Sequence, residues 1–257
     1  MKILVFVKQT PDTYGDRKLD TSTGRVDRGA SEAVLDEVTE RALEAALVQQ
    51  DDAGAEVVVA SMGPASVEDA LRKALAMGAD SAIHIVDDAL VGSDLIKTAK
   101  VLSAVAKRVG ADLVLAGNES TDGRGGVIPA IVADSLGLPH ATFLNSFLIG
   151  GDKVTGNRVT EDGSLDLEVP LPAVVSVTEQ APEARFPSFR GIMKAKKKPL
   201  DRLAVSDLGI ADELAAGGSS VVVSTAEKPP RQAGTKIVDE GDAGVKIAEY
   251  LASARLI

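Results

Sequence analysis

Short apolar runs and longer amphipathic stretches alternate along the first half of the chain. Four of the runs have the length of a strand: residues 3–7, 57–60, 82–86 and 113–116. Three stretches with helical periodicity lie between them: residues 31–49, 66–77 and 93–109. Nearly continuous apolar runs of this length are typical of parallel strands that are covered on both faces. In the first helical stretch, Leu35, Val38, Ala42 and Ala45 fall on one face.

A glycine follows a helical stretch at three places, just before the next strand. These residues are Gly78, Gly110 and Gly137. Glycine is favoured there because a left-handed residue commonly ends a helix. Repetition of helix, glycine and strand predicts successive right-handed crossovers. The predicted fold class is therefore α/β, with a doubly wound, mostly parallel sheet that is Rossmann-like and adenine nucleotide alpha-hydrolase-like.

The pattern changes after about residue 143. Polar and apolar residues alternate there around Gly-Gly and Asp-Gly turns, which predicts antiparallel hairpins that extend the sheet or form a small edge. Beyond Pro199 the chain is irregular, with a Gly/Ser-rich part at residues 215–220 and helical periodicity at residues 239–255. We expect one α/β domain with the hairpins at residues 1–200, and a linker with a helical arm at residues 201–257.

Composition excludes several classes of function. Of the 257 residues, 45% are hydrophobic and 26% are charged, as in a soluble globular protein. No apolar run reaches the roughly 18 residues of a membrane-spanning helix, and the apolar start is too short for a signal peptide. We therefore expect a cytoplasmic protein without membrane insertion. The net charge of −10 argues against nucleic acid as a partner, because binding along phosphates needs a basic face.

The sequence contains no recognisable catalytic centre. Cysteine is absent, which excludes disulfides, thiolate chemistry and iron–sulfur ligation. His84 and His140 are the only histidines. His84 is expected to be a half-buried strand residue and His140 to lie near a strand start, so no metal site is predicted. Gly-x-Ser-x-Gly, HExxH and CxxC motifs are also missing. We predict a protein that is not an enzyme and has no catalytic residues of its own.

A glycine-rich turn follows the fourth predicted strand. Residues 117–126, GNESTDGRGG, contain four glycines and lead into a helical stretch. Glycines let the backbone approach a phosphate, and the start of the next helix stabilises its charge. Arg124 could add a charged contact. Two further turns, at residues 6–10 and 61–64, also follow strands, where doubly wound sheets bind ligands. The pattern favours a nucleotide site, with a purely structural turn as the alternative.

Residues 185–199, RFPSFRGIMKAKKKP, combine apolar side chains with four lysines in an otherwise acidic chain. Adjacent apolar and basic residues indicate a docking element, in which an anchor and a steering charge lie side by side. A surface loop with solvated lysines is the alternative.

Six motifs resemble the beta subunit of the electron transfer flavoproteins and occur in that family's order. They are VKQTPD (residues 7–12), SMGPA (61–65), ALAMGAD (74–80), GNESTDGRGG (117–126), GIMKAKKK (191–198) and PPRQAG (229–234). The similarity spans nearly the whole chain. It implies an electron-carrier subunit that pairs with a larger alpha subunit, receives electrons from acyl-CoA and related dehydrogenases in fatty acid oxidation, and passes them to a flavoprotein–quinone oxidoreductase.

The resemblance also implies two cofactors. FAD would be held mainly by the alpha subunit, near Thr13 or Tyr14 of this chain, and AMP would occupy the crevice at the strand ends. The residues that match the family's nucleotide contacts are Phe6, Lys8, Asp36, Glu37, Val38, Thr39, Met62, Gly117, Asn118, Ser120, Thr121, Asp122, Gly123, Arg124, Gly125, Gly126, Val127 and Ile128.

Two departures from the family weaken the expectation of side-chain contacts. Asp36-Glu37 stands where many relatives have Asn-Pro, and Val127-Ile128 replaces a pair that begins with Gln. The ligand is therefore expected to be held more by the backbone. An alternative for Asp36 is the ordinary role of an acid at a helix start.

In the family, an apolar residue just before the GIM or NIM triplet anchors in a pocket of partner dehydrogenases. Phe189 occupies that place within a docking loop at residues 183–198, with Phe186, Ile192 and Met193 beside it. The resemblance further implies that the C-terminal arm wraps the alpha subunit.

Three other readings stay open from sequence alone. A bifurcating-type subunit would hold a second FAD in place of AMP. A stand-alone regulator resembling universal stress proteins would share the α/β core. A hydrolase on the same sheet is disfavoured, because no nucleophile and base can be nominated.

Overall fold

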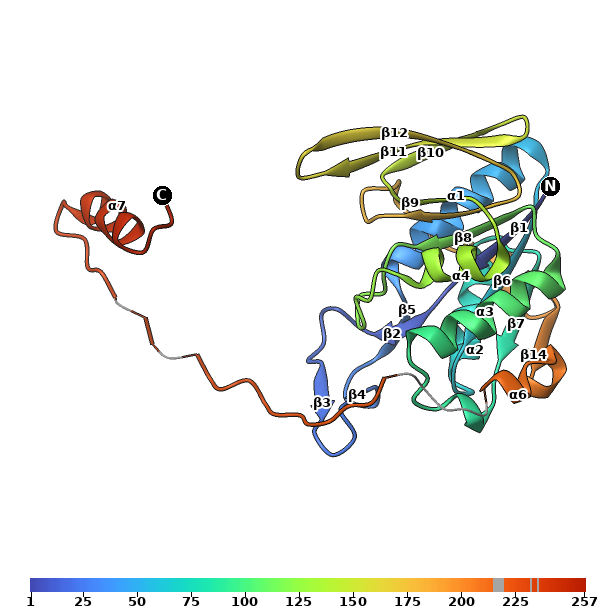
Figure 1. Ribbon diagram of the computed structural model, residues 1–257, viewed down its shortest axis with the longest axis horizontal. Coiled ribbons are helices and arrows are strands. Elements are labelled where there is room, and N and C mark those ends of the chain that lie inside the picture. The colour runs from blue at the N-terminus through green and yellow to red at the C-terminus, as the bar shows by residue number, and fades with distance from the viewer. Residues whose placement is uncertain (215–219, 232, 235) are drawn as a thin grey trace. The chain divides into compact units, whose positions relative to one another are not determined.

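A parallel sheet of seven strands lies at the centre of the structure, a computed structural model that describes residues 1–214, 220–231, 233–234 and 236–257. From edge to edge the strands are β14 (Leu200–Leu203), β7 (Ser81–Ile85), β6 (Glu56–Met62), β1 (Lys2–Phe6), β8 (Leu113–Gly117), β13 (Ala173–Val177) and β9 (His140–Leu144) (Figure 1). All neighbouring strands pair in parallel. The doubly wound α/β fold predicted from the sequence is confirmed.

Four helices cover the two faces of this sheet. They are α1 (Glu37–Ala53), α2 (Val67–Met77), α3 (Leu95–Val109) and α4 (Ile128–Leu136). Helices α1 and α2 share one buried apolar cluster with alternate residues of the strands, and α3 and α4 share the other. Gly110 and Gly137 end their helices at φ 64° and 65°, as expected for left-handed caps. Gly78 differs, with φ 156°.

The first helix begins later than predicted. Residues 33–35 form strand β5 (Ala33–Leu35), which pairs antiparallel with β2 (Gln9–Pro11). Leu35 is therefore a strand residue and does not lie on the helix face. The helix starts after Asp36, whose carboxylate accepts hydrogen bonds from the N–H groups of Val38 and Thr39 at 3.1 and 3.4 Å. Such a cap satisfies donors that have no partner within the helix.

Between β2 and β5 the chain makes a small excursion that includes strands β3 (Lys18–Asp20) and β4 (Arg25–Asp27). We call residues 12–32 the hairpin segment. It lies next to the small sheet of β2 and β5 (Figure 1).

The predicted hairpins form a sheet of their own. Strands β10 (Ser146–Gly150), β11 (Lys153–Thr160) and β12 (Gly163–Pro170) pair antiparallel in sequence order. Val154 is 1% exposed and belongs to the main apolar cluster, to which Phe147, Leu167 and Val169 also pack. The hairpins therefore cover the core near β9 without extending the parallel sheet.

The domain boundary expected after residue 200 is placed too early. Residues beyond it form β14, which pairs with β7, the 3-10 helix η2 (Val205–Leu208) and helix α6 (Ala211–Leu214). Leu203, Val205 and Leu214 are buried in the cluster shared with α3. The compact unit consequently extends from Met1 to Ser224. A second 3-10 helix, η1 (Asp88–Leu90), precedes α3. Of the Gly/Ser-rich part, residues 215–219 lie outside the described residues.

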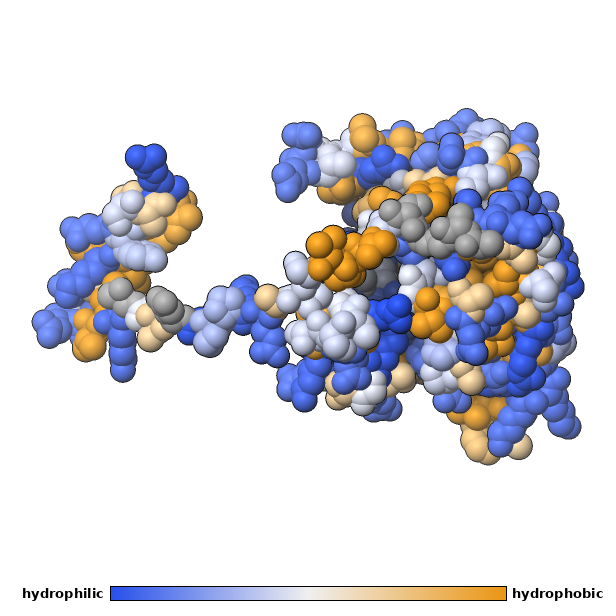
Figure 2. All heavy atoms as spheres, turned by 60° about the horizontal axis from the view of Figure 1, so that its bottom comes forward, coloured by the Kyte–Doolittle hydropathy of each residue, from blue (hydrophilic) through white to orange (hydrophobic). Residues whose placement is uncertain are grey.

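Residues Thr225–Ile257 form a second unit. Helix α7 (Ala243–Ser253) has no buried side chain. Apolar and charged residues share its surface (Figure 2), and Val245, Ile247 and Tyr250 are at least half exposed. No helix among the described residues has both the length and the apolar character to cross a membrane.

Candidate functional site

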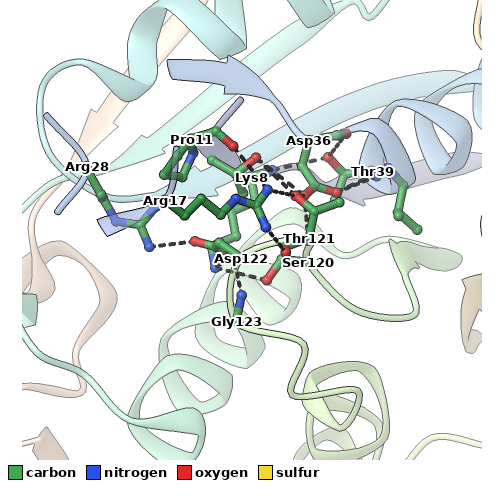
Figure 3. Close-up of polar contacts among 12 residues, drawn as sticks. Lys8, Pro11, Arg17, Arg28, Asp36, Thr39, Ser120, Thr121, Asp122 and Gly123 are labelled. Carbon is green, nitrogen blue, oxygen red and sulfur yellow. Dashed lines mark hydrogen bonds and ion pairs between the residues drawn. The ribbon is translucent and has the colours of Figure 1, made fainter. Parts of the chain in front are cut away.

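The strand order reverses between β1 and β8, because β6 and β7 follow on one side of β1 and β8 and β13 on the other. Ligands of doubly wound sheets bind at the carboxyl ends of the strands at such a point. The chain that leaves β1 carries Lys8, and the chain that leaves β8 is the predicted phosphate turn. We call residues 117–127 the nucleotide loop. Figure 3 shows that Lys8, Asp36 and the middle of this loop meet here.

Asp36 joins the start of α1 to the nucleotide loop. Beyond capping the helix, its carboxylate accepts hydrogen bonds from the Thr121 N–H at 2.8 Å and the Thr121 hydroxyl at 2.7 Å. The Asp36 residue is 1% exposed. Thr39 donates its hydroxyl to the Asp36 carbonyl at 2.8 Å. Because these protein donors already occupy the carboxylate, Asp36 acts as a cap and a support for the loop.

Asp122 lies at the centre of a second set of contacts. Its carboxylate accepts from Lys8 Nζ at 2.8 Å and from Arg28 Nη2 at 2.7 Å, and its side chain is 1% exposed. Lys8 also donates to the Ser120 hydroxyl at 3.0 Å. Burial favours the neutral acid, but the Lys8 ammonium, the Ser120 hydroxyl and the Arg28 guanidinium outweigh it and hold the pKa of Asp122 well below its usual value.

The glycines of the loop allow close approach of the backbone. A Cβ on Gly117 would lie 3.0 Å from Val38 Cγ1, so the loop leaves β8 tightly against the start of α1. Gly126 has φ 67° and Arg124 φ 47°. The Arg124 side chain pairs with Glu119 at 3.0 Å and is 75% exposed.

Helix α4 has no side-chain acceptor at its start. Val127 occupies the cap position and Pro129 lies in the first turn. The first N–H groups of this helix therefore have no capping side chain, which is the usual arrangement where a helix start receives an anion. Val127 and Ile128 can contribute backbone donors there and no polar side chain.

Two buried polar atoms at the strand ends have no hydrogen-bond partner. They are Ser61 Oγ, from the end of β6, and Asn118 Oδ1, directly after β8. Ser61 is 1% and Asn118 7% exposed. An unpaired buried polar atom costs about 1–3 kcal/mol, so these positions fit a ligand that supplies the missing partner. Phe6 is buried and Met62 partly buried on the α3 side of the same strand ends, where an apolar ring could pack.

Other predicted residues lie away from these contacts. Glu37 is exposed in the first turn of α1. Thr13 and Tyr14 lie in the hairpin segment, and Tyr14 is 99% exposed. His84 is fully buried in β7 and not half-buried as expected, with Nε2 3.0 Å from the Gly63 carbonyl oxygen. His140, as expected, begins a strand.

The segment expected as a docking loop is partly helical. Helix α5 (Phe189–Ala195) begins after Ser188, whose hydroxyl accepts from the Gly191 N–H at 3.1 Å. The apolar side chains predicted to dock are solvent-exposed: Phe186 94%, Phe189 81%, Ile192 46% and Met193 51%. Gly191 lies directly on α2, because a Cβ there would be 2.3 Å from the Ala76 carbonyl oxygen.

Charged side chains hold both ends of residues 185–198, which we call the docking segment. Arg185 forms a fork with Glu44 of α1 at 2.8–3.1 Å and also reaches Asp51. Arg72 of α2 donates to the carbonyls of Ala195 and Lys198 at 2.8 and 3.1 Å.

Lys198 departs from the expected solvated lysine run. Its ammonium donates to the carbonyls of Leu75, Gly78 and Ala79 at 3.1, 2.8 and 2.6 Å. Burial lowers the pKa of Lys198, and the Asp80 carboxylate opposes that shift. One lysine of the run is therefore a structural element.

Sequence reasoning missed the arginines that complete the site. Arg17 donates to the carbonyl of Thr121, and to its hydroxyl at 3.0 Å. Arg28 completes the Asp122 pair (Figure 3). The only sequence signal was the presence of basic residues in a polar excursion near the first strand.

Known proteins resemble this chain along its whole length. A family model described as "Electron transfer flavoprotein domain" matches residues 23–208. The chain is 49% identical to the electron transfer flavoprotein subunit beta of Mycobacterium leprae, over 99% of both chains. It is 32% identical to the protein of the same name from Megasphaera elsdenii, over 100% of both. It is also similar to the caffeyl-CoA reductase-Etf complex subunit CarD of Acetobacterium woodii, at 35% identity over 93% of this chain and 92% of that one.

Proposed function

This chain belongs to the electron transfer flavoprotein beta-subunit family, and we propose that it is the small subunit of a heterodimer that carries electrons from acyl-CoA and related dehydrogenases to a quinone oxidoreductase. FAD, held mainly by the alpha subunit, supplies the electron-carrying chemistry. This chain contributes a nucleotide site, a docking surface and a C-terminal arm. The observation that carries the proposal is the full-length similarity combined with exposed apolar side chains on a firmly held segment.

The nucleotide site is proposed to hold AMP. Three features support it: the uncapped start of α4, the glycine-rich loop, and the unpaired atoms Ser61 Oγ and Asn118 Oδ1. Phosphate would be bound chiefly by backbone N–H groups. Lys8 is paired with Asp122, and Asp36 accepts from Thr121. We therefore propose that these side chains hold the loop in place and do not bind the phosphate themselves.

The docking segment is proposed to bind dehydrogenases through Phe189, with Phe186, Ile192 and Met193 around it. Its two ends are held by Arg185 and Lys198, while the apolar side chains face solvent. An anchor that is already ordered loses little conformational entropy on binding. Full burial of an aromatic ring contributes about 2 kcal/mol, which corresponds to roughly thirtyfold in affinity.

The C-terminal unit is proposed to pack on the alpha subunit. Helix α7 exposes Val245, Ile247 and Tyr250 and has no buried side chain within this chain. An amphipathic helix without a buried face is expected to find one on a partner.

Co-expression with a candidate alpha subunit tests the proposal. We expect a yellow heterodimer with one FAD and one AMP after nucleotide extraction. Two FAD molecules per heterodimer and no AMP would instead indicate the bifurcating type. A colourless protein that ignores the alpha subunit would contradict the assignment and favour a stand-alone nucleotide-binding regulator.

The docking role is tested with Phe189→Ala in the same heterodimer. We expect unchanged flavin content and a KM for the dehydrogenase that rises by about an order of magnitude. Val91→Ala is the control, because Val91 is an exposed apolar residue (66%) outside the segment. Equal kinetics for Phe189→Ala and the control would refute the anchor.

A further inference from the structure

The hairpin segment has almost no apolar attachment to the rest of the protein. No residue from 12 to 32 is buried as a whole. Its strands β3 and β4 have three residues each, and Tyr14 and Leu19 are 99% and 45% exposed. A segment with few buried contacts opens at a low free energy unless polar contacts hold it. The position of this segment therefore depends on its polar contacts.

Two arginines of the segment reach the nucleotide loop. Arg17 donates to the carbonyl and, at 3.0 Å, to the hydroxyl of Thr121, and its other contact is the Pro11 carbonyl at 3.2 Å. Arg28 Nη2 lies 2.7 Å from Asp122 Oδ2. The arginines thus contact two successive residues of the loop (Figure 3).

The same two loop residues are also held by the body of the protein. Asp36 accepts from the N–H and the hydroxyl of Thr121, and Lys8 donates to Asp122 Oδ1. The Asp122 carboxylate is thus shared between a cation from the end of β1 and a cation from the hairpin segment. Movement of the hairpin segment would break the contacts of Arg17 with Thr121 and of Arg28 with Asp122. The buried Asp122 carboxylate would then have one partner fewer.

We propose that Arg17 and Arg28 are positioning residues that couple the hairpin segment to nucleotide binding. This inference rests on the proposed nucleotide site. A nucleotide that stabilises the loop also stabilises the segment, and by thermodynamic reciprocity the ordered segment raises nucleotide affinity by the same factor. Because Thr13 and Tyr14 belong to this segment, an adenine nucleotide in this subunit determines how firmly they are presented to the alpha subunit.

The charge arrangement favours this coupling over simple attachment. Removal of Arg28 leaves Asp122 paired with Lys8 alone, so the Lys8 ammonium and the loop backbone can rearrange. The Arg28–Asp122 contact is charge-assisted; the Asp122 side chain is 1% exposed, but the Arg28 side chain is 47% exposed, so salt screens the contact in part. The loop conformation that binds phosphate is then populated for a smaller fraction of the time, and the apparent affinity falls by that fraction.

The test uses the FAD-loaded heterodimer, freed of AMP by gel filtration. AMP affinity is measured by calorimetry, and hydrogen–deuterium exchange of residues 15–30 is measured with and without AMP. In the unmodified protein we expect AMP to slow exchange in the segment several-fold. In the double variant Arg17→Gln/Arg28→Gln, we expect AMP affinity to fall about tenfold, within the usual range of coupling, and AMP to have no effect on exchange there.

Two further variants exclude a general loss of structure. Arg25→Gln removes an arginine of the same segment whose side chain lies against Gly92, and should retain both effects. Arg17→Lys/Arg28→Lys keeps the charges and should restore part of the affinity. Two results would overturn the coupling alone. One is that AMP binds the unmodified protein without changing hydrogen exchange in the hairpin segment. The other is that the double Gln variant binds AMP as tightly as the unmodified protein. Failure of the unmodified heterodimer to bind AMP would overturn the coupling together with the proposed site.

Discussion

Lys198 offers a sharp test of how the docking segment is held. Its ammonium donates to three carbonyls at the end of α2, at 2.6–3.1 Å. Helix α2 has no basic residue in its own last turn, so Lys198 supplies, from about 120 residues away in sequence, the cation that the end of a helix dipole favours. The perturbation is Lys198→Met, which keeps the length of the side chain and removes the charge and the donors.

The magnitude follows from opposing contributions. Hydrogen bonds from a charged donor contribute about 1.5–3 kcal/mol each. Desolvation of the ammonium, which is why burial lowers the Lys198 pKa, cancels much of that sum. A net loss of about 2 kcal/mol remains, because three carbonyls are left without this donor. For this chain alone, that corresponds to a fall of roughly 4–8 °C in Tm, and to a smaller fall in the larger heterodimer.

The assay is thermal unfolding of the heterodimer by circular dichroism at a fixed scan rate, with hydrogen exchange of residues 189–195 as a local readout. Lys197→Met is the matched control, because Lys197 is exposed in the same run. The control should stay within about 0.5 kcal/mol of the unmodified protein. If Lys198→Met and Lys197→Met have the same Tm and the same exchange, the three carbonyl contacts do not stabilise the segment and the reasoning is refuted.

Three further predictions follow from the same structure. Gly191→Ala would place a Cβ 2.3 Å from the Ala76 carbonyl oxygen, so α5 must shift. Electron transfer from dehydrogenases should then slow while the flavin content stays constant. Gly150→Ala is the control, because its Cβ meets nothing within 4 Å, and it should leave the rate of electron transfer unchanged. Because the Asp122 pKa is lower folded than unfolded, its contribution to stability is present above about pH 4 and lost as pH falls further. Urea unfolding should therefore show Asp122→Asn about 2 kcal/mol less stable at pH 6, with the gap narrowing below pH 4; a constant gap would contradict this. Asp36→Ala removes the α1 cap and the Thr121 contacts and should cost about 2 kcal/mol with weaker AMP binding, while Asp36→Asn should retain part of the cap; equal loss in both variants would count against the capping role.

The regular part of the fold was predictable because its signal is local. Continuous apolar runs located β1, β6, β7 and β8, and the helices between them followed from periodicity. Strand β14 was missed because its four residues, LDRL, are half polar at the edge of the sheet and do not read as a buried strand. The start of α1 was misplaced because an apolar strand, β5, directly precedes the capping residue Asp36 and continues the helical pattern by coincidence.

The position of the candidate site along the chain followed from the sequence, whereas its contacts did not. The glycine-rich turn after β8 indicated the proposed nucleotide loop, because glycines allow backbone conformations that other residues rarely adopt. The partners of Asp122 could not be deduced, because Lys8 and Arg28 lie 114 and 94 residues away and only the fold brings them together. Lys198 could not be distinguished from its neighbours in a run of lysines, because its role depends on the end of α2.

The nucleotide loop and the docking segment share a physical design that explains these failures. In the proposed function each presents groups to a ligand or partner and so does not bury them in its own core: the loop leads into a helix start without a capping side chain, and the docking segment keeps Phe186 and Phe189 in solvent. With little apolar burial of their own, both depend on charged side chains. Lys8, Arg17 and Arg28 hold the loop. Glu44 and Arg72 hold the docking segment, whose own Lys198 reaches the end of α2. Such contacts are directional and fix geometry in a way that apolar packing of a few small residues would not. Lys and Arg side chains make most of these contacts, in a chain whose net charge is −10. Substitution of these cations should therefore weaken binding at the two surfaces before it unfolds the protein.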